Sequence, residues 1–402
     1  MIEMISMGEC LIELFSEEPI ETSKTFTRSM AGDSFNIVVA ASRLGTKTGY
    51  ITKLGDDPFK GYLKNSFRSE GVDTSHVIVD RGKGFNAAHF VAVDENGERE
   101  FVYYRKGSAP STIRPSDIKE AYISNAKIMH CSGIAQAISE TSRKAVLKAA
   151  RIAKDHGILV SYDPNYRHQL WTHKEARAAM EEIIPFVDIF LPSAPADTIP
   201  LFDTDNPEIA VSEAQRRGVK TTVVTMGEKG SLLSSPEGSK WFEPFIGGRV
   251  IDTTGAGDAY KGGFIHGLLE GFTPSDAATI GNISAGLTIT SMQLWVGIIL
   301  KSSSMISHVC AVENQSSINL CNKLKDQLEK ISKRLGTDNY KKIDKQISIA
   351  FQSNNKDEHH KWIQQLLQNY YDKMYDYQLD KKMGRCIYKG TWNDIEAFLS
   401  EY

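Results

Sequence analysis

The sequence contains neither a Cys-x-x-Cys pair nor a GxxxxGK[ST] phosphate-binding loop. Its five cysteines are scattered and odd in number, which is typical of thiols kept reduced in the cytoplasm. The missing loop argues against a P-loop kinase. The chain also begins without a basic segment followed by an apolar core, so we expect no signal peptide and a cytoplasmic location.

Long apolar runs and a strong net charge are also lacking. The longest apolar stretch, near residues 287–300, contains Gln293 and is too short to span a bilayer. A net charge of −3 over 402 residues indicates neither a membrane nor a nucleic acid as partner. These features fit a soluble globular protein with one large domain and an additional segment.

Proline and glycine become scarce towards the C-terminus. All 13 prolines occur at or before Pro274, and few glycines follow Gly297. Residues 298–402 carry 16 Lys and Arg against 13 Asp and Glu and have the composition of polar helices. We therefore predict a junction around residues 297–304, where Lys-Ser-Ser-Ser is typical of a flexible link.

Hydrophobic periodicity in the first part alternates between strands and helices. Apolar strands are expected at residues 2–7, 48–53, 127–131, 158–162, 187–191 and 221–225. Helices are expected at residues 35–44, 58–70, 139–156, 173–184, 207–217, 257–270 and 275–290. This order predicts an α/β fold in which helices cover both faces of a central, mostly parallel sheet. Alternating segments at 10–15, 85–93 and 99–105 are typical of antiparallel strands.

The most informative segment is DTTGAGDAYKGGF, which starts at Asp252. It follows a short β-type run and opens an apolar helical pattern, so Gly255, Ala256 and Gly257 stand where a helix begins. Their N–H groups lack intrahelical partners and, with the helix dipole, form an anion site suited to phosphate. Asp258 makes sense there as a base that accepts a proton from an attacking hydroxyl. The alternative is a tight turn with Asp258 as an N-terminal helix acid.

This segment resembles the C-terminal signature of the ribokinase/PfkB family of carbohydrate kinases. Two other segments match the family pattern in order: AGDSFN at 31–36, before an apolar helix, and LGDDPFKG at 54–61, after the next strand. The resemblance covers residues 1 to about 291. It implies a ribokinase-like kinase domain over residues 1–296, with a small β lid over the sugar, that uses ATP and Mg²⁺. It also leaves open a homodimer formed through lid strands.

The resemblance places contacts to sugar hydroxyls in the GDSFN segment. Gly32 would let the backbone approach the ligand, and Asp33 and Asn36 would bind paired hydroxyls. The alternative for both polar residues is helix N-capping. Glu13 falls where acids of the lid hinge occur in the family, and a plain surface glutamate is the alternative.

Two segments narrow the expected substrate to a sugar acid. FVYYRKGS at 101–108 and DPNYR at 163–167 resemble segments of 2-keto-3-deoxygluconate kinases, which make the 6-phosphate. A guanidinium binds a carboxylate through two parallel hydrogen bonds, so Arg105 and Arg167 are candidates to bind the substrate carboxylate. Tyr103 could stack on the substrate or donate a hydrogen bond from its hydroxyl. The alternative is that each arginine forms a surface or interstrand ion pair. Some fructokinase-like relatives share the second segment.

The nucleotide would bind at the segment VVTMGEKG. There Thr225, Gly227 and Gly230 would approach ribose and phosphates, and Asn282 matches a family position that faces adenine. The alternatives are a strand with a glycine turn and a helix-surface asparagine.

The chain departs from the family at two places. An Asn-x-x-Glu pattern linked to Mg²⁺ is replaced by residues 193–196 with Asp197 next, so we expect Mg²⁺ to be held chiefly through water and the nucleotide. The loop that completes a monovalent-cation site with Asp252 and Thr254 is replaced by residues 291–297. A K⁺ site is therefore in doubt.

Residues from about 313 onward resemble the C-terminal region of tRNA 2-selenouridine synthases, most specifically in the run YYDKMYDYQL. Neither the rhodanese-like domain nor the P-loop domain of those enzymes is expected here. We predict a helical extension over 305–402, left by a gene fusion, whose Tyr and Leu side chains form a core. The alternative is a basic, aromatic RNA surface that includes Lys381, Lys382 and Arg385.

Two hypotheses for the whole chain follow. The first is an ATP-dependent kinase that phosphorylates a small sugar or sugar acid, most similar to 2-keto-3-deoxygluconate kinase. The second is a catalytically impaired remnant whose helical tail binds RNA or protein. The intact catalytic segment favours the first hypothesis, and the missing family loop favours the second.

Overall fold

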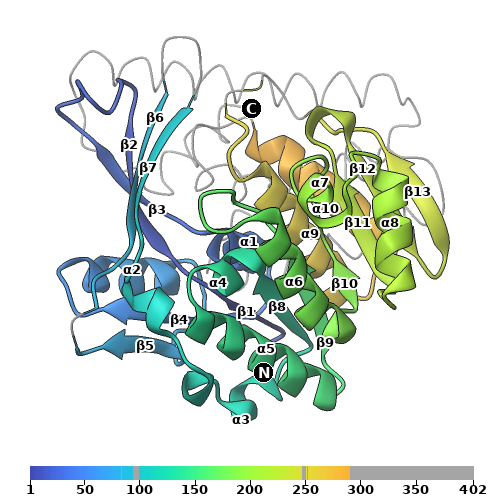
Figure 1. Ribbon diagram of the computed structural model, residues 1–402, viewed down its shortest axis with the longest axis horizontal. Coiled ribbons are helices and arrows are strands. Elements are labelled where there is room, and N and C mark those ends of the chain that lie inside the picture. Colours follow the sequence, from blue (N-terminus) through green and yellow to red (C-terminus); the bar gives the residue numbers. More distant parts are fainter. Residues whose placement is uncertain (83, 94–98, 247–249, 251, 290–402) are drawn as a thin grey trace, which may run out of the picture. The chain divides into compact units, whose positions relative to one another are not determined.

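The computed structural model describes residues 1–82, 84–93, 99–246, 250 and 252–289, which belong to one compact unit, Met1–Ile299. Within these residues, nine strands form a central sheet in the order β13-β12-β11-β10-β9-β8-β1-β4-β5 (Figure 1). Its pairings are parallel except at one edge, where β12 pairs antiparallel with both β11 and β13. The predicted α/β fold with a mostly parallel sheet is confirmed.

The strands of this sheet are β1 (Met4–Met7), β4 (Thr48–Gly55), β5 (Val77–Asp80), β8 (Ile128–Ser132), β9 (Leu159–Asp163), β10 (Ile189–Phe190), β11 (Thr221–Thr225), β12 (Ser231–Ser235) and β13 (Gly238–Phe242). Successive side chains of a strand point to opposite faces. In β1, Met4 packs into one hydrophobic cluster, whereas Ile5 and Met7 pack into another. A strand buried on both faces is apolar without alternation, which explains the character of the predicted strands.

Helices cover both faces of the sheet (Figure 1). One face packs against α5, α6 and α8, and the other against α1, α9 and α10. The main helices are α1 (Asp33–Arg43), α2 (Phe59–Ser69), α5 (Glu140–Asp155), α6 (His173–Ile183), α8 (Pro207–Arg216), α9 (Ala256–Leu269) and α10 (Pro274–Thr288). Short helices are α3 (Glu120–Ile123), α4 (Gly133–Ala137) and α7 (Thr198–Phe202). Side chains cap the N-termini of several helices. At α5, for example, the Ser139 side chain accepts a hydrogen bond from the Ser142 amide at 3.0 Å.

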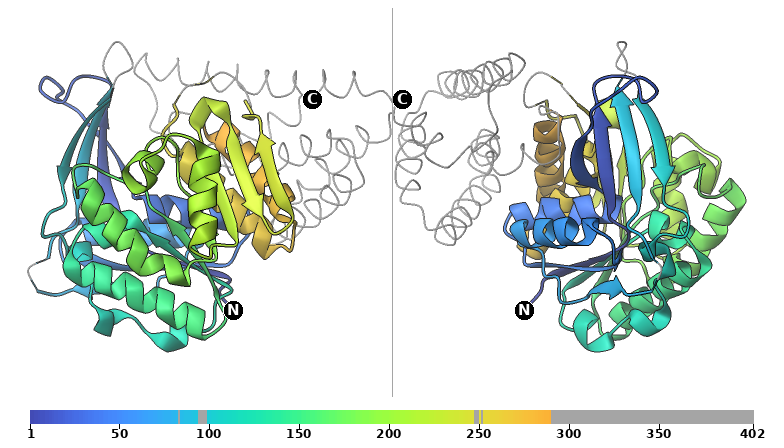
Figure 2. Two further views of the ribbon diagram at one scale, coloured as in Figure 1. Left: turned by 45° about the vertical axis from the view of Figure 1, so that its right-hand side comes forward. Right: turned by 90° about the vertical axis from the view of Figure 1, so that its left-hand side faces the viewer.

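A second sheet forms the predicted lid and projects from the body (Figure 2). It consists of β2 (Leu11–Ser16), β3 (Thr27–Ala31), β6 (Ala88–Val93) and β7 (Arg99–Tyr104), in the order β3-β2-β6-β7. The β2–β3 and β6–β7 pairs are antiparallel, but β2 and β6 run parallel. The expectation of purely antiparallel lid strands was therefore wrong. A long crossover through α1, β4, α2 and β5 separates β2 from β6, which permits parallel pairing.

The predicted helices agree with the structure to within ~2 residues at each end, the usual uncertainty of helix boundaries. The strand expected at 187–191 shrinks to Ile189–Phe190, and β3, β5, β12 and β13 were not predicted. The last of these is an exposed edge strand without an apolar pattern. No helix in the described part of the chain is long and apolar enough to cross a membrane. Most of the predicted β-type run at 248–251, and all of the predicted helical extension, lie outside the described residues.

Candidate active site

The start of α9 forms the predicted anion site. Gly255 precedes the helix with a φ of 72°, a left-handed conformation that glycine adopts without strain. Within the described residues, the amides of Gly255, Gly257 and Asp258 make no hydrogen bond, which leaves them available to an anion. The Ala256 amide instead donates to the Thr253 carbonyl at 3.3 Å. The expectation that the Ala256 amide points outward is corrected, because the turn that starts the helix uses it.

Asp258 is the third residue of α9 and meets α1. The Nδ2 atom of Asn36 donates to its Oδ2 at 2.8 Å. Burial, assisted by the Asp33 carboxylate and opposed by the Lys261 charge and the Asn36 hydrogen bond, raises the pKa of Asp258 to about 6. Such a group is ionised at neutral pH and more basic than an ordinary aspartate, as a general base requires.

A buried lysine lies one helical turn beyond Asp258. The Nζ atom of Lys261 donates to Asp163 Oδ2 at 2.6 Å, and the two side chains are 4% and 0% exposed. Burial lowers the pKa of Lys261, but Asp163, Asp197 and Asp258 together raise it above its usual value. Burial also raises the pKa of Asp163 to about 7. Lys261, a residue of the catalytic helix itself, therefore carries a positive charge that three acids stabilise.

Sequence reasoning missed Lys261 and gave Asp197 no structural role. Asp197 is buried and accepts hydrogen bonds from the amides of Tyr166, at 2.7 Å, and Ser193, at 2.6 Å. It thereby joins the loops that follow β9 and β10. The available signal was a lysine inside an otherwise apolar helix start, because an unpaired lysine is almost never buried.

The predicted sugar residues meet the catalytic helix. Asp33 is buried, and its Oδ2 accepts hydrogen bonds from Ser132 Oγ and, at 3.2 Å, from Asn165 Nδ2. Its Oδ1 is buried and has no hydrogen-bond partner among the described residues. Neither Asp33 nor Asn36 caps α1, whose N-cap Gly32 receives no side-chain bond. A Cβ on Gly32 would lie 2.4 Å from the Glu9 carbonyl, so only glycine fits there.

Arg105 is already paired. Its Nη2 donates to Glu9 Oε1, and both side chains are nearly buried. The Tyr103 ring lies under the same guanidinium, 4.8 Å away. The structure thus matches the ion-pair alternative for Arg105, whose guanidinium is already bound to a carboxylate. The buried Oε2 of Glu9 and Nε of Arg105 nevertheless lack partners within the described residues.

Arg167 is exposed and forms no ion pair within the described residues. Burial raises the pKa of Tyr103, and the charges of Arg105 and Arg167 oppose that shift. The Arg167 charge also lowers the pKa of Asp258. The charge of Arg167 is therefore felt both by Tyr103 of the lid and by Asp258, the candidate base. Glu13, in contrast, stays within the lid, where it accepts from Ser29 Oγ at 2.7 Å and contacts His89 Nε2 at 3.1 Å.

The predicted nucleotide residues lie at the carboxyl end of β11. Thr225 Oγ1 is 2.9 Å from Ser193 Oγ, and the glycines 227 and 230 have φ values of 58° and 81°. A Cβ on Gly230 would lie 1.9 Å from the Phe242 carbonyl. Asn282 holds the loop after β13 by accepting from the Phe245 amide at 3.1 Å and donating to a backbone carbonyl at 2.6 Å. Asn282 therefore makes structural hydrogen bonds, and its position beside adenine stays a prediction.

Asp252 and Thr254, the predicted partial K⁺ site, are also engaged. Asp252 Oδ1 accepts the Thr254 amide at 2.7 Å and pairs with Arg99 Nη2 from the lid strand β7. The sequence did not indicate this lid contact.

The model of the pfkB family of carbohydrate kinases matches residues 1–295. The chain belongs to this family. The family is one of carbohydrate kinases, and the roles of the residues described above stay predictions.

Curated relatives are kinases of several sugars. The chain is 33% identical over 296 residues to 2-dehydro-3-deoxygluconokinase of Thermoproteus tenax, which covers 72% of this chain and 89% of the relative. It is 30% identical over 298 residues to 5-dehydro-2-deoxygluconokinase of Geobacillus thermodenitrificans, with 72% and 88% covered. It is 35% identical over 274 residues to probable fructokinase-3 of Arabidopsis thaliana, with 66% and 78% covered.

Solved structures share the fold. A PfkB protein from Polaromonas sp. JS666 has a TM-score of 0.68 at 29% identity and covers 74% of this chain and 99% of its own. A putative ribokinase II from E. coli, solved with ATP and Mg²⁺, has a TM-score of 0.70 at 24% identity and covers 77% and 100%. The predicted ribokinase-like fold is confirmed.

The tail matches a different family. The model of the tRNA 2-selenouridine synthase AAA domain matches residues 300–402, which confirms the resemblance of the tail. The match names the AAA domain of those enzymes, and the expectation that their P-loop domain is missing from this chain stays a prediction. The GxxxxGK[ST] loop itself is still absent from the sequence. The domain boundaries at 296 and 305 stay predictions.

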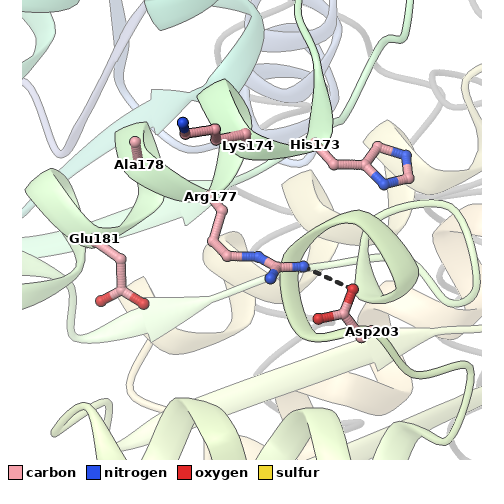
Figure 3. Close-up of a pocket in the computed structure, with 6 residues that line it drawn as sticks. All are labelled: His173, Lys174, Arg177, Ala178, Glu181 and Asp203. Carbon is pink, nitrogen blue, oxygen red and sulfur yellow. Dashed lines mark hydrogen bonds and ion pairs between the residues drawn. The ribbon is translucent and has the colours of Figure 1, made fainter.

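Figure 3 shows a surface pocket. It is lined by His173, Lys174, Arg177, Ala178, Glu181 and Asp203, from α6 and the end of α7. Arg177 and Asp203 form an ion pair across it at 2.9 Å. None of the predicted site residues lines this pocket, so it has no role in the kinase site described here.

Proposed function

We propose that this kinase transfers the γ-phosphoryl group of ATP to 2-keto-3-deoxygluconate and forms its 6-phosphate. The observation that carries the proposal is the position of Asp258, whose pKa is raised to about 6 beside three available amides at the start of α9. Asn36, which contacts this carboxylate, and Asp33, with a buried oxygen that has no partner among the described residues, belong to the segment expected to bind hydroxyls. A base, an anion site and hydroxyl acceptors thus converge.

The step itself needs little more than positioning. The acceptor hydroxyl gives its proton to Asp258 while its oxygen attacks the γ-phosphorus, and the bond to the β-phosphate oxygen breaks as ADP leaves. The amides of Gly255 and Gly257 stabilise the charge on the transferred group, because they are fixed before the reaction begins. Lys261 keeps the neighbouring acids neutralised without contacting the hydroxyl.

ATP and Mg²⁺ fit the residues present. The described residues contain no group of three His, Cys, Asp or Glu side chains arranged to hold a metal ion. Mg²⁺ often keeps several waters and binds through substrate phosphates with one or two carboxylates, so such a group is not required. Thr225, Gly227 and Gly230, at the turn that follows β11, are the proposed contacts for ribose and phosphates. Asn282, which holds the loop after β13, is the proposed contact for adenine.

A sugar acid suits the charge of the site better than a neutral ketose. Arg167 forms no ion pair among the described residues, and its charge acts on Tyr103 and Asp258, so a carboxylate would be its natural bidentate partner. Arg105 contributes less directly, because Glu9 already neutralises it. Two of the relatives described above are named for ketodeoxy sugar acids, which supports this choice, and the fructokinase relative provides the competing one.

Arg167→Ala tests the substrate class. Loss of a charge-assisted bidentate pair costs about 1.5–3 kcal/mol, so KM for 2-keto-3-deoxygluconate should rise at least ~10-fold. KM for fructose should hardly change, because fructose has no carboxylate. Arg177→Ala, on α6 and outside the predicted site residues, is the matched control and should alter neither value. Equal losses on both substrates would assign Arg167 to the fold and not to the carboxylate.

We further propose that the lid strands pair two copies into a homodimer. Strand β7 is an edge strand of the lid sheet and exposes Phe101 and Tyr104, which are 42% and 59% exposed. Among the described residues no further strand pairs with this edge, and an edge with apolar side chains favours pairing with another strand. Light scattering on the full wild-type chain and on the Phe101→Lys variant tests the homodimer. The wild type should have twice the mass of a monomer, whereas the variant should have the mass of one monomer.

A further inference from the structure

The ion pair between Arg99 and Asp252 joins the lid to the catalytic loop. Arg99 is the first residue of β7, and Asp252 precedes α9 by a few residues. Their side chains are 24% and 17% exposed, so the pair is largely shielded from solvent. An ion pair in such a place interacts more strongly than one on the open surface, where screening removes most of its effect.

Asp252 is fixed from three directions. Its amide donates to the Ile289 carbonyl, just after α10, at 3.2 Å. Its Oδ1 accepts the Thr254 amide at 2.7 Å and the Arg99 guanidinium. Thr254 is followed directly by Gly255, whose amide opens the anion site. Arg99 therefore acts on the anion site through Asp252 and the turn that this carboxylate holds, which makes it a positioning residue.

A monovalent cation does not fit beside this carboxylate. The cation expected from the family resemblance would need Asp252 and Thr254 as ligands, but the guanidinium already neutralises the Asp252 charge and is bound to its Oδ1. A guanidinium is always charged and donates directed hydrogen bonds, so it supplies both the charge and the rigidity that a bound cation would give. A second positive charge at this point would be repelled.

We propose that Arg99 takes the place of a monovalent cation at the catalytic loop, so that turnover by this kinase is independent of K⁺. The proposal rests on the kinase activity argued above and adds a residue to it. It also links the two ends of β7: Arg99 fixes the catalytic loop, while Tyr103 and Arg105 lie at the sugar end of the same lid strand.

The test compares turnover with and without K⁺ at constant ionic strength, with tetramethylammonium chloride as the replacement salt. ADP is separated and measured directly, so that no coupling enzyme adds its own cation requirement. The wild-type full chain should have the same kcat/KM in both salts to within ~2-fold. Arg99→Met should lose ~10-fold or more without K⁺, because the charge-assisted bond to Asp252 is gone, and should regain most of this with K⁺. Arg99→Lys should keep most of the K⁺ independence, because it keeps the charge.

Arg28→Met is the matched control, since Arg28 is an exposed lid arginine that lies over the Tyr62 ring and, in the described part of the chain, makes no hydrogen bond or ion pair with residues 252–255. It should respond to K⁺ like the wild type. Strong activation of the wild type by K⁺, or an Arg99→Met variant that K⁺ does not rescue, would overturn the proposal. If the wild type phosphorylates no sugar, the proposed function fails, and thermal unfolding decides the inference separately: K⁺ should raise the Tm of Arg99→Met and leave that of the wild type unchanged.

Discussion

At the residue scale, the reactivity of Asp258 depends on its neighbours. Burial raises the pKa of this carboxyl, and the Lys261 charge and the Asn36 hydrogen bond limit the rise so that it stops near 6. Without that limit, part of the base would be protonated at neutral pH. The proposed activity should therefore fall as pH drops through about 6, because the protonated carboxyl accepts no proton.

Asn36→Ala should move this acidic limb to higher pH. The variant removes a hydrogen bond that favours the ionised form, so the pKa of Asp258 rises further. The measurement is the pH dependence of kcat/KM, in which a loss of sugar contacts alone would lower the curve without shifting it. Asn125→Ala, at an exposed site whose side chain donates to the Ala121 carbonyl, should leave the limb in place. An unshifted limb in Asn36→Ala would remove Asn36 from the control of the base.

Individual residues were predictable where a local motif defines them. The helix start, glycines and acid of the catalytic segment are adjacent in sequence, so Asp258 could be predicted from spacing. Lys261 with Asp163, and Arg105 with Glu9, are pairs formed between segments about a hundred residues apart. Such pairs depend on tertiary packing, which no local pattern contains, and this is why Arg105 was expected to be free to bind the substrate carboxylate.

At the element scale, α9 connects the anion site to the core of the sheet. Its first turn carries Asp258, and its second turn carries Lys261 against Asp163 at the carboxyl end of β9. The carboxyl ends of parallel strands are where ligands usually bind in open α/β sheets. The buried pair therefore sets the position of the catalytic helix relative to the sheet.

Lys261→Met should destabilise the protein in a pH-dependent way. Removing one partner of a buried ion pair typically costs about 3–5 kcal/mol, because the other charge stays buried and unpaired. The pKa of Asp163, already raised to about 7 by burial, should rise further, so the loss is small at low pH and grows as pH rises through that value. Urea unfolding at about pH 6 and about pH 8 measures the difference.

The exposed pair of Lys144 with Glu140 provides the control for this experiment. Lys144→Met should change the free energy of unfolding by less than ~0.5 kcal/mol at either pH. A double variant with Asp163→Asn and Lys261→Met should recover part of the lost stability at high pH, because the unpaired charge is gone. An equal loss in the single Lys261 variant at both pH values would contradict the electrostatic explanation.

Elements with a strong period were predicted well, and those that depend on partners were not. Five of the seven predicted helices have one apolar face and can be located from periodicity, whereas α9 and α10 are buried on most sides. The parallel pairing of β2 with β6 and the exposed strand β13 depend on which segments meet, because neither has a distinctive pattern of its own.

At the scale of the whole molecule, the chain combines two family matches that meet between residues 295 and 300. The kinase match includes all the residues proposed to act in phosphoryl transfer. The tail has the sequence of an AAA-domain segment without its phosphate-binding loop, and it carries only a small positive balance of charge. The tail is therefore not expected to contribute a nucleotide site or a strong phosphate-binding surface.

We predict that the tail adds nothing to the chemistry and binds no tRNA tightly. A chain that ends after Ser304 should phosphorylate sugar acid within a few-fold of the full chain. At ~0.15 M salt, the full chain should not bind tRNA with sub-micromolar affinity. Its small positive balance of charge in the tail would neutralise few phosphates. Tight tRNA binding would revive the RNA-binding alternative, and loss of turnover on truncation would show that the tail completes the kinase fold.

The most direct test of the central claim is turnover of the full chain and of Asp258→Asn with ATP, Mg²⁺, and either 2-keto-3-deoxygluconate or fructose. The account predicts that the wild type prefers the sugar acid and that the variant still binds ATP but loses ~10²–10⁴-fold in kcat, the usual contribution of a general base. A wild type that prefers fructose would contradict the proposed substrate. An Asp258→Asn variant that keeps more than about half of the wild-type kcat would contradict the role of this carboxylate.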